Sequence, residues 1–228
     1  MKRKHSHAFP IHSRKNEVRD DITNGEEDDG SNGVGIGILK SLMKQKVDCI
    51  GNHIWFNTDV TNQSISQLNK IIHAKNFLFS QKKRESENTF ELIPKPLYLH
   101  ITSYGGDLLE GMAGVDCIVN STIPIYTIIE GYAASAATFL SVVGKKRYMT
   151  RNSVLLIHQL SAGAWGKMEE LEDEHKNNTF FMKKIYSLYK KYTEISKEKL
   201  EKKMKRDIWW GYKKCKKYGF VDEVYTNE

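Results

Sequence analysis

Two short stretches of the chain alternate apolar and polar side chains, and each leads into apolar residues at helical spacing. Residues 97–102 and 125–130 alternate with a period of two, which is typical of β-strands. Residues 108–119 and 133–144 follow with apolar side chains three or four positions apart, which indicates helices. Gly131 is expected to end the second strand. The chain therefore predicts two consecutive strand-turn-helix units and, with them, an α/β fold.

Shorter elements are predicted on both sides of these two units. We expect a hairpin turn at Gly51-Asn52, a helix capped by Asn62, a surface loop over the charged residues 80–89, and a helix capped by Ser196. Further strands are expected at 46–50, 53–56, 147–149, 154–159 and 220–225, with one helix at 197–206 and a short one that ends at Tyr218-Gly219.

Residues 167–192 form the longest helical pattern of the chain. Acidic residues cluster in its first turns and basic residues in its last, which matches the helix dipole. Its apolar side chains, among them Phe180, Phe181, Ile185 and Leu188, exceed what one small core takes up. We therefore expect this helix to contact another subunit.

Length and composition suit a single domain. The 228 residues are 39% hydrophobic and 28% charged, which is enough for one substantial core but not for two. Residues 1–33 are polar, first basic and then acidic, so we expect a flexible leader there and one domain over 34–228. Residues 1–16 do not form an amphipathic helix rich in Arg and Ser, which argues against a transit peptide.

The cysteines suggest neither a disulfide framework nor a metal site. Cys49, Cys117 and Cys215 lie far apart, without C-x-x-C spacing or a His/Cys cluster. We expect a reducing, cytoplasmic location, with neither a metal nor an organic cofactor. No apolar run approaches the roughly 18 residues of a membrane span, so no membrane partner is expected.

The net charge of +7 is concentrated in one segment. Residues 197–217 hold ten Lys and Arg against three acidic residues. Such a run can bind nucleic acid or an acidic partner, but it can equally be a solvated helix face. No recognised nucleic-acid motif accompanies it, so we expect the solvated face.

Candidate chemistry lies at the corners of the two strand-turn-helix units. Ser135 is the one reactive group in the second turn, and small alanines surround it, so its Oγ could reach a substrate carbonyl. Backbone N–H groups at such corners are free of the sheet, so Gly106 and Ala136 could bind an oxyanion. Ser135 could instead cap the following helix. His158, at the end of a strand, could be a base or an ordinary residue at the rim of the core.

Several motifs in order make the chain resemble the ClpP family of serine peptidases over about 40–224. They are Gly105-Gly106, the run from Gly131 to Ala136, Ile157-His158-Gln159, Arg206-Asp207, and Tyr218-Gly219-Phe220-Val221-Asp222. The resemblance implies a ClpP/crotonase-like ββα spiral in which the 167–192 helix is a protruding handle. It also implies two stacked heptameric rings around a closed chamber, fed by an AAA+ unfoldase of the ClpX or ClpA type.

The resemblance also assigns a role to each candidate residue. Ser135 matches the nucleophile, His158 the general base and Asp207 the aspartate that orients the histidine. Gly106 and Ala136 match the oxyanion donors. The chain departs from the family pattern at Ser103-Tyr104-Gly105-Gly106, where the family usually has Ser-Pro-Gly-Gly.

The sequence thus predicts a serine endopeptidase that acts on unfolded polypeptides within a homo-oligomeric ring. Two alternatives remain at this point. One is a catalytically inactive ring subunit with a structural role, and the other is an acyl-CoA enzyme on the related crotonase fold. The presence of Ser135, His158 and Asp207 together argues against both, because neither needs all three.

Overall fold

A seven-stranded sheet forms the centre of the computed structural model, which describes residues 47–86 and 92–226. The predicted leader, 1–33, and the predicted domain start at residue 34 lie outside these ranges. The strands are β1 (Val47–Ile50), β2 (His53–Phe56), β3 (Leu97–Ser103), β4 (Ile125–Ala134), β5 (Lys146–Met149), β6 (Val154–Leu156) and β7 (Glu223–Val224). The helices are α2 (Asn62–Ser86), α3 (Leu108–Val119), α4 (Ala137–Val142), α5 (Met168–Tyr192), α6 (Lys197–Met204) and α7 (Tyr212–Lys217).

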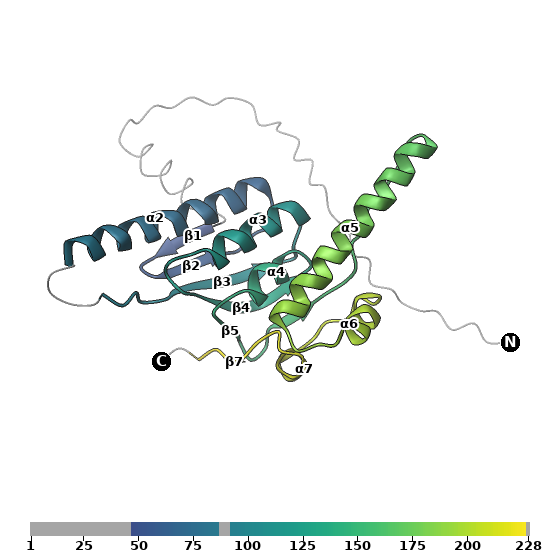
Figure 1. The fold of residues 1–228 in the computed structure, drawn as a ribbon. Coiled ribbons are helices and arrows are strands. Elements are labelled where there is room, and N and C mark those ends of the chain that lie inside the picture. The colour runs from purple at the N-terminus through teal and green to yellow at the C-terminus, as the bar shows by residue number, and fades with distance from the viewer. Residues whose placement is uncertain (1–46, 87–91, 227–228) are drawn as a thin grey trace, which may run out of the picture. The chain divides into compact units, whose positions relative to one another are not determined.

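The strands follow the order β1-β2-β3-β4-β5-β7, and β6 pairs with the end of β4. Only β1 and β2 are antiparallel, joined by the predicted tight turn at Gly51, whose φ is 58°. The other pairs are parallel, so each connection from β2 to β5 crosses over through a helix. Figure 1 shows α2, α3 and α4 lying together on one face of the sheet. The predicted mixed α/β fold with a protruding helix is confirmed.

The core lies between that face and its helices. Leu97, Leu99 and Ile101 of β3 point into it and are at most 1% exposed, as their alternation predicts. The opposite face carries stacked rings, among them His53, Tyr98 and His100. The alternation along β3 thus separates an aliphatic face from an aromatic one.

Several predicted boundaries are wrong. The strands predicted at 154–159 and 220–225 are shorter in the structure, as β6 and β7. Gly131 does not end β4, because the strand continues to Ala134 through a bulge in which the glycine takes a φ of 70°. Opposite the bulge, Ile101 pairs with Ile129 but Ser103 pairs with Ala133. The bulge turns the end of β4 toward β6, and the chain reaches Ser135 from there.

The predicted surface loop at 80–89 is also wrong over its first part. Helix α2 continues to Ser86, because its Lys, Gln and Arg residues are good helix formers that need no apolar partner when they face water. The helix start differs as well: Thr61, not Asn62, exchanges backbone-to-hydroxyl hydrogen bonds with Ser64.

Helix α5 projects away from the sheet, and only its second half is anchored (Figure 1). Its buried residues are Ile185 and Tyr189, both in that half. The prediction that Ile185 contacts another subunit is therefore wrong, because its side chain is 3% exposed within the core of its own chain. The free half carries exposed apolar side chains instead, including Met168, Leu171 and Phe180.

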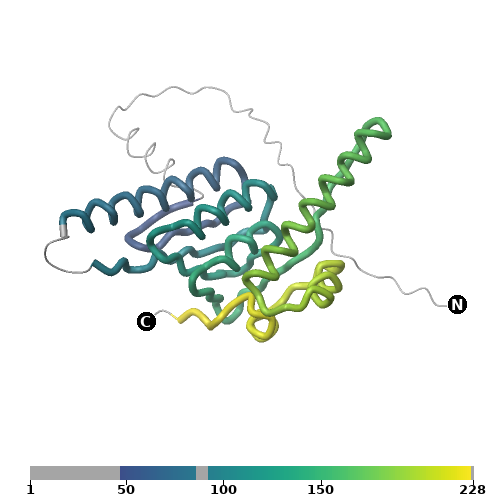
Figure 2. The backbone as a smooth tube through the Cα atoms, viewed as in Figure 1, coloured from purple at the N-terminus to yellow at the C-terminus, as the bar shows by residue number. Residues whose placement is uncertain are grey.

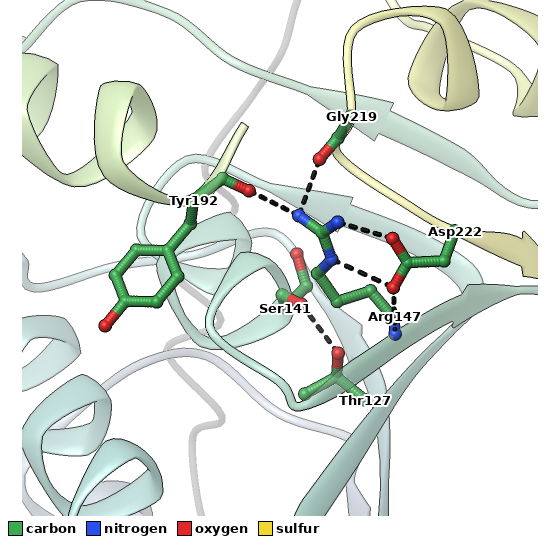
Figure 3. A network of polar contacts seen from close by, with 6 residues as sticks. All are labelled: Thr127, Ser141, Arg147, Tyr192, Gly219 and Asp222. Carbon is green, nitrogen blue, oxygen red and sulfur yellow. Dashed lines mark hydrogen bonds and ion pairs between the residues drawn. The ribbon is translucent and has the colours of Figure 1, made fainter. Parts of the chain in front are cut away.

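Arg147 joins the end of α5 to the C-terminal part of the chain. Its guanidinium pairs with the Asp222 carboxylate through Nε and Nη2, and Nη1 donates to the carbonyl oxygens of Tyr192 and Gly219 (Figure 3). A planar guanidinium can hold several acceptors at fixed angles, which a lysine cannot. The tube in Figure 2 shows the C-terminal segment running from α7 back along the edge of the sheet, where β7 pairs with β5.

Among the described residues, no helix is both long and apolar enough to cross a membrane, and no group of three His, Cys, Asp or Glu side chains could hold a metal ion. Cys49, Cys117 and Cys215 are all free thiols.

Candidate functional site

Ser135 occupies the turn between β4 and α4 in a conformation that few residues adopt. Its φ is 53°, and it is the one non-glycine residue with a positive φ in the described ranges. Such a backbone costs on the order of 1–3 kcal/mol and persists only where its surroundings enforce it. Here the Ser135 N–H donates to Leu156 O at 3.0 Å, and Ser135 O accepts from the Thr138 N–H at 2.9 Å.

The alternative that Ser135 caps α4 is wrong. The N-cap residue is Ala136, and no side chain caps this helix. The hydrogen bonds of Ser135 all run through its backbone, so its Oγ is left without a partner in the described part of the chain. The side chain is half-buried beside this turn, which leaves the hydroxyl available to a substrate.

Gly105 and Gly106 follow β3 and are called the glycine corner below, and Gly105 lies directly against the Ser135 turn. A Cβ added to Gly105 would lie 2.7 Å from Ser135 Cβ and 2.6 Å from Ala134 O, closer than side chains approach. Gly105 also has a φ of 98°, where residues other than glycine are strained. Both the space and the backbone therefore require glycine at this position.

Gly106 is fixed by a short parallel bridge to Val60. The Val60 N–H donates to Gly105 O at 2.7 Å, and the Asp107 N–H donates to Val60 O at 2.8 Å. In a parallel bridge the residue between these two bonds turns its own N–H the other way. Neither the Gly106 N–H nor the Ala136 N–H finds an acceptor within the described residues, so both can donate to a bound group.

His158 follows β6, the strand that pairs with the end of β4 just before Ser135. Leu156, which holds the Ser135 N–H, lies two residues before it. The His158 ring is half-exposed, and its Nδ1 lies 2.6 Å from the carbonyl oxygen of Gln159. Because a carbonyl can only accept, Nδ1 carries the proton and Nε2 keeps its lone pair. Nε2 makes no hydrogen bond in the described structure.

Asp207 lies on a segment that runs antiparallel to the one carrying His158. Leu155 and Trp210 exchange backbone hydrogen bonds of 2.9 and 2.7 Å, and the Gln159 N–H donates to Met204 O at 2.9 Å. The bond to Met204 does not continue the register of the Leu155–Trp210 bridge, and a further bond from the Ile208 N–H to Arg206 O bends the segment at Asp207. The side chains of Asp207 and His158 form no hydrogen bond, and Asp207 is exposed.

The structure thus brings Ser135, Gly106, Ala136 and the His158 segment together around one turn, and it does not join Asp207 to the histidine. Such a grouping of a hydroxyl, an imidazole and two free N–H groups suits acyl transfer. The catalytic roles of these five residues remain predictions.

Tyr189 supports this turn and was not among the predicted site residues. The Tyr189 hydroxyl of α5 lies 2.6 Å from Thr138 Oγ1, which donates to Ser135 O, also at 2.6 Å. Complete burial raises the pKa of Tyr189 well above its ordinary value, so the hydroxyl keeps its proton. Within the apolar stripe of α5, a tyrosine only 1% exposed signals a buried hydroxyl that needs a partner.

One comparison with known proteins bears on these observations. The family model described as Clp protease matches residues 88–228, which is more than half of the chain and includes all five candidate residues. The mixed α/β architecture agrees with the fold of that family. The predicted resemblance is confirmed, and the chain belongs to the Clp protease family.

Proposed function

We propose that this protein is a serine endopeptidase, the proteolytic subunit of a ring assembly, and that it hydrolyses peptide bonds in unfolded polypeptides. The conformation of Ser135 carries this proposal. Ser135 is held at a strained φ of 53°, it does not cap α4, and Gly105 packs against it. A role in catalysis explains why the chain keeps this backbone strain. Membership of a protease family supports the same reaction class.

In the proposed reaction, Ser135 Oγ attacks the carbonyl carbon of the scissile peptide bond while His158 Nε2 takes the hydroxyl proton. The carbonyl oxygen becomes an oxyanion, which the Gly106 and Ala136 N–H groups bind. When the C–N bond breaks, His158 returns the proton to the leaving amine. Water, deprotonated by His158, then releases the acyl group and restores the Ser135 hydroxyl. Asp207 is proposed to stabilise the imidazolium that forms twice in this cycle.

We further propose assembly into two stacked rings through α5. Members of this family form oligomeric rings, and α5 has the charge pattern for pairing with a second copy of itself. Its five acidic residues all lie within 168–174, and Lys183, Lys184, Lys190 and Lys191 follow in its second half. In an antiparallel pair each acidic half would face a basic half, and the exposed Phe180 would be covered. An AAA+ unfoldase is the proposed supplier of unfolded substrate, in a cytoplasmic setting.

Labelling with a fluorophosphonate and cleavage of a quenched peptide test the activity. The parent protein should be labelled at Ser135, and Ser135→Ala should abolish labelling and lower kcat by about 10⁴ to 10⁶. Ser187→Ala, at an exposed serine of α5, is the matched control and should leave both unchanged. A parent that assembles into rings but is neither labelled nor active would refute the proposal.

One observation favours the second candidate, a catalytically inactive ring subunit. His158 and Asp207 are not hydrogen-bonded to each other, and a triad without its aspartate link is weaker. The same labelling experiment separates the candidates, because an inactive subunit would assemble without reacting.

A further inference from the structure

The face of the sheet that turns away from α2, α3 and α4 carries rings from several strands. The strand register sets Tyr98 of β3 between His53 of β2 and Tyr126 of β4. At the other side of the sheet, Tyr148 of β5 is the partner of Glu223 of β7. The sheet therefore brings aromatic side chains and a carboxylate, from strands far apart in the sequence, onto a single face.

A pocket of about 460 Å³ opens on this face. The rings of Tyr98, Tyr148 and Tyr225 line it together with His53 and Glu223. Tyr148 and Tyr225 meet at an angle, with their centroids 6.0 Å apart and their planes at 66°. Tyr98 stacks on His53 with the centroids 4.8 Å apart. We call Tyr98, Tyr148, Tyr225 and Glu223 the aromatic cage.

The aromatic cage is electronegative although its rings are uncharged near neutral pH. Burial is the main cause that raises the pKa of both Tyr148 and Tyr225. Tyr98 adds to both pKa shifts, so the three hydroxyl groups lie near one another. Glu223 also raises the pKa of Tyr148, and Glu130 that of Tyr225, so two carboxylates act on the cage. Because the face of an aromatic ring is itself negative, every one of these groups favours a cation.

A cation of the chain itself already rests on this face of the sheet. The Lys146 Nζ lies 5.6 Å from the centroid of the Tyr126 ring, within the range of a cation–π contact. Tyr126 meets Tyr98 edge-on, with the centroids 5.7 Å apart. Neither Lys146 nor Tyr126 lines the pocket, so the cage itself is left open.

The chemistry of the aromatic cage fits one kind of cation best. A primary ammonium group is strongly hydrated, so it loses much of its hydration when it enters a pocket of rings. A quaternary ammonium group has no N–H to leave unpaired, and its methyl groups can contact the ring faces directly. An uncharged group of the same shape would gain the burial but not the attraction to the rings and to Glu223.

We propose that the aromatic cage binds a quaternary ammonium group, supplied either by a free amine of the choline type or by a trimethylated lysine side chain. This inference goes beyond the proposed peptidase function and does not depend on it, because no residue of the cage is among the proposed catalytic residues. In a partly exposed cage, the positive charge should improve affinity about tenfold over an uncharged isostere.

Two small molecules of the same shape test the proposal on the full-length parent protein. Choline and neohexanol, in which carbon replaces the quaternary nitrogen, each give one sharp methyl signal in ligand-observed NMR titrations. We expect choline to bind about tenfold more tightly than neohexanol. Equal affinities, or tighter binding of neohexanol, would overturn the proposal, because the pocket would then recognise apolar shape and not charge.

A pair of peptides distinguishes the two sources of the ligand. One carries trimethyl-lysine, and the other carries lysine at the same position. Binding of the trimethyl-lysine peptide above that of choline would identify a protein ligand, and the reverse order would identify a free amine. A lysine peptide that binds as tightly as the trimethyl-lysine peptide would contradict the preference for a quaternary group.

Variants test whether the cage is the site. Tyr148→Ala and Tyr225→Ala should each weaken choline binding about tenfold, whereas Tyr225→Phe, which keeps the ring, should bind like the parent. Glu223→Gln, at an exposed position, should weaken choline binding and leave neohexanol binding unchanged. Phe77→Ala, at an exposed ring of α2, is the control and should change neither. Parental choline affinity in both Tyr225→Ala and Glu223→Gln would remove the site from this face.

Discussion

The imidazole of His158 is held by the carbonyl oxygen of Gln159, 2.6 Å from Nδ1, and not by the carboxylate of Asp207. A carbonyl fixes the same tautomer as a carboxylate, because both accept the Nδ1 proton. A carbonyl is neutral, however, and does less to stabilise an imidazolium. We therefore expect Asp207 to act on the imidazolium only through its charge.

Replacing Asp207 by Asn should lower kcat by about 10- to 100-fold, less than the roughly 10⁴-fold loss known where the aspartate alone fixes the tautomer. The reason is that Gln159 O continues to hold Nδ1–H in the variant. Steady-state cleavage of a quenched peptide, compared with that of Ser135→Ala, measures the effect. Equal losses in the two variants would mean that the assembled ring brings Asp207 onto His158 after all.

Gly105 is the position where the smallest substitution should do the most harm near the site. Gly105→Ala places a Cβ 2.7 Å from Ser135 Cβ at a φ of 98°, which costs about 1–3 kcal/mol in backbone strain alone. Differential scanning calorimetry should show a melting temperature lower by several degrees, and fluorophosphonate labelling should fall steeply.

Gly163→Ala is the matched control for that variant. Gly163 has no atom within 4 Å of an added Cβ, so this variant should melt and react like the parent. A Gly105→Ala protein with parental labelling would show that the glycine corner does not position Ser135.

A histidine pair on the aromatic face of the sheet should make stability depend on pH. His53 Nδ1 lies 2.9 Å from His100 Nε2, and His100 Nδ1 lies 2.7 Å from Glu130 Oε1. Burial first and His100 second lower the pKa of His53 below its ordinary 6.5, against the opposing effect of Glu130. The unfolded chain therefore binds the proton more readily than the folded one.

It follows that His53 favours the folded state above pH 6.5 and that this contribution is lost as the pH falls through 6.5 toward the lowered pKa of His53. Thermal melts between about pH 7.5 and 5.5 should show a falling melting temperature, and His53→Gln should make the fall shallower. Identical pH profiles for the parent and His53→Gln would contradict this assignment.

The strands were predictable because their alternation reflects burial directly. Leu97 and Ile125 open strands near the predicted positions, since apolar side chains on one face leave a period of two in the sequence. The end of α2 was not predictable in this way, because its last turns contact little and their polar residues resemble a loop. The bulge at Gly131 was missed for a related reason: a strand that bends and a strand that ends both place glycine there.

The candidate site was only partly predictable. The order of motifs identified Ser135 and His158, and the structure adds how Ser135 is held. The Gln159 carbonyl and the Tyr189 hydroxyl could not be foreseen, because hydrogen bonds to a backbone oxygen or between distant hydroxyls leave no local pattern. The apolar side chains along α5 predicted a contact surface, but they did not show that Ile185 would be buried in the core of its own chain.

The free half of α5 provides the last prediction, a link between assembly and activity. Leu171 is 38% exposed and Phe180 is 53% exposed, so replacing both by Asp should leave the subunit folded while placing charge in the proposed α5 pair. We expect smaller species in sedimentation velocity. Ile185→Asp should instead unfold the protein, because this side chain is in the core.

The smaller species should also cleave poorly, because the second half of α5 contacts the turn that carries Ser135. Tyr189 reaches Ser135 O through Thr138, so a helix that loses its partner is free to shift this chain of hydrogen bonds and, with it, the backbone that holds Ser135 at its unusual φ. Asn177→Asp with Thr179→Asp adds the same charge at two exposed polar positions of α5 and should keep both ring size and activity. A Leu171→Asp, Phe180→Asp protein that stays a full ring would remove α5 from the interface, and one that dissociates yet cleaves peptides at the parental rate would show that assembly and catalysis are independent.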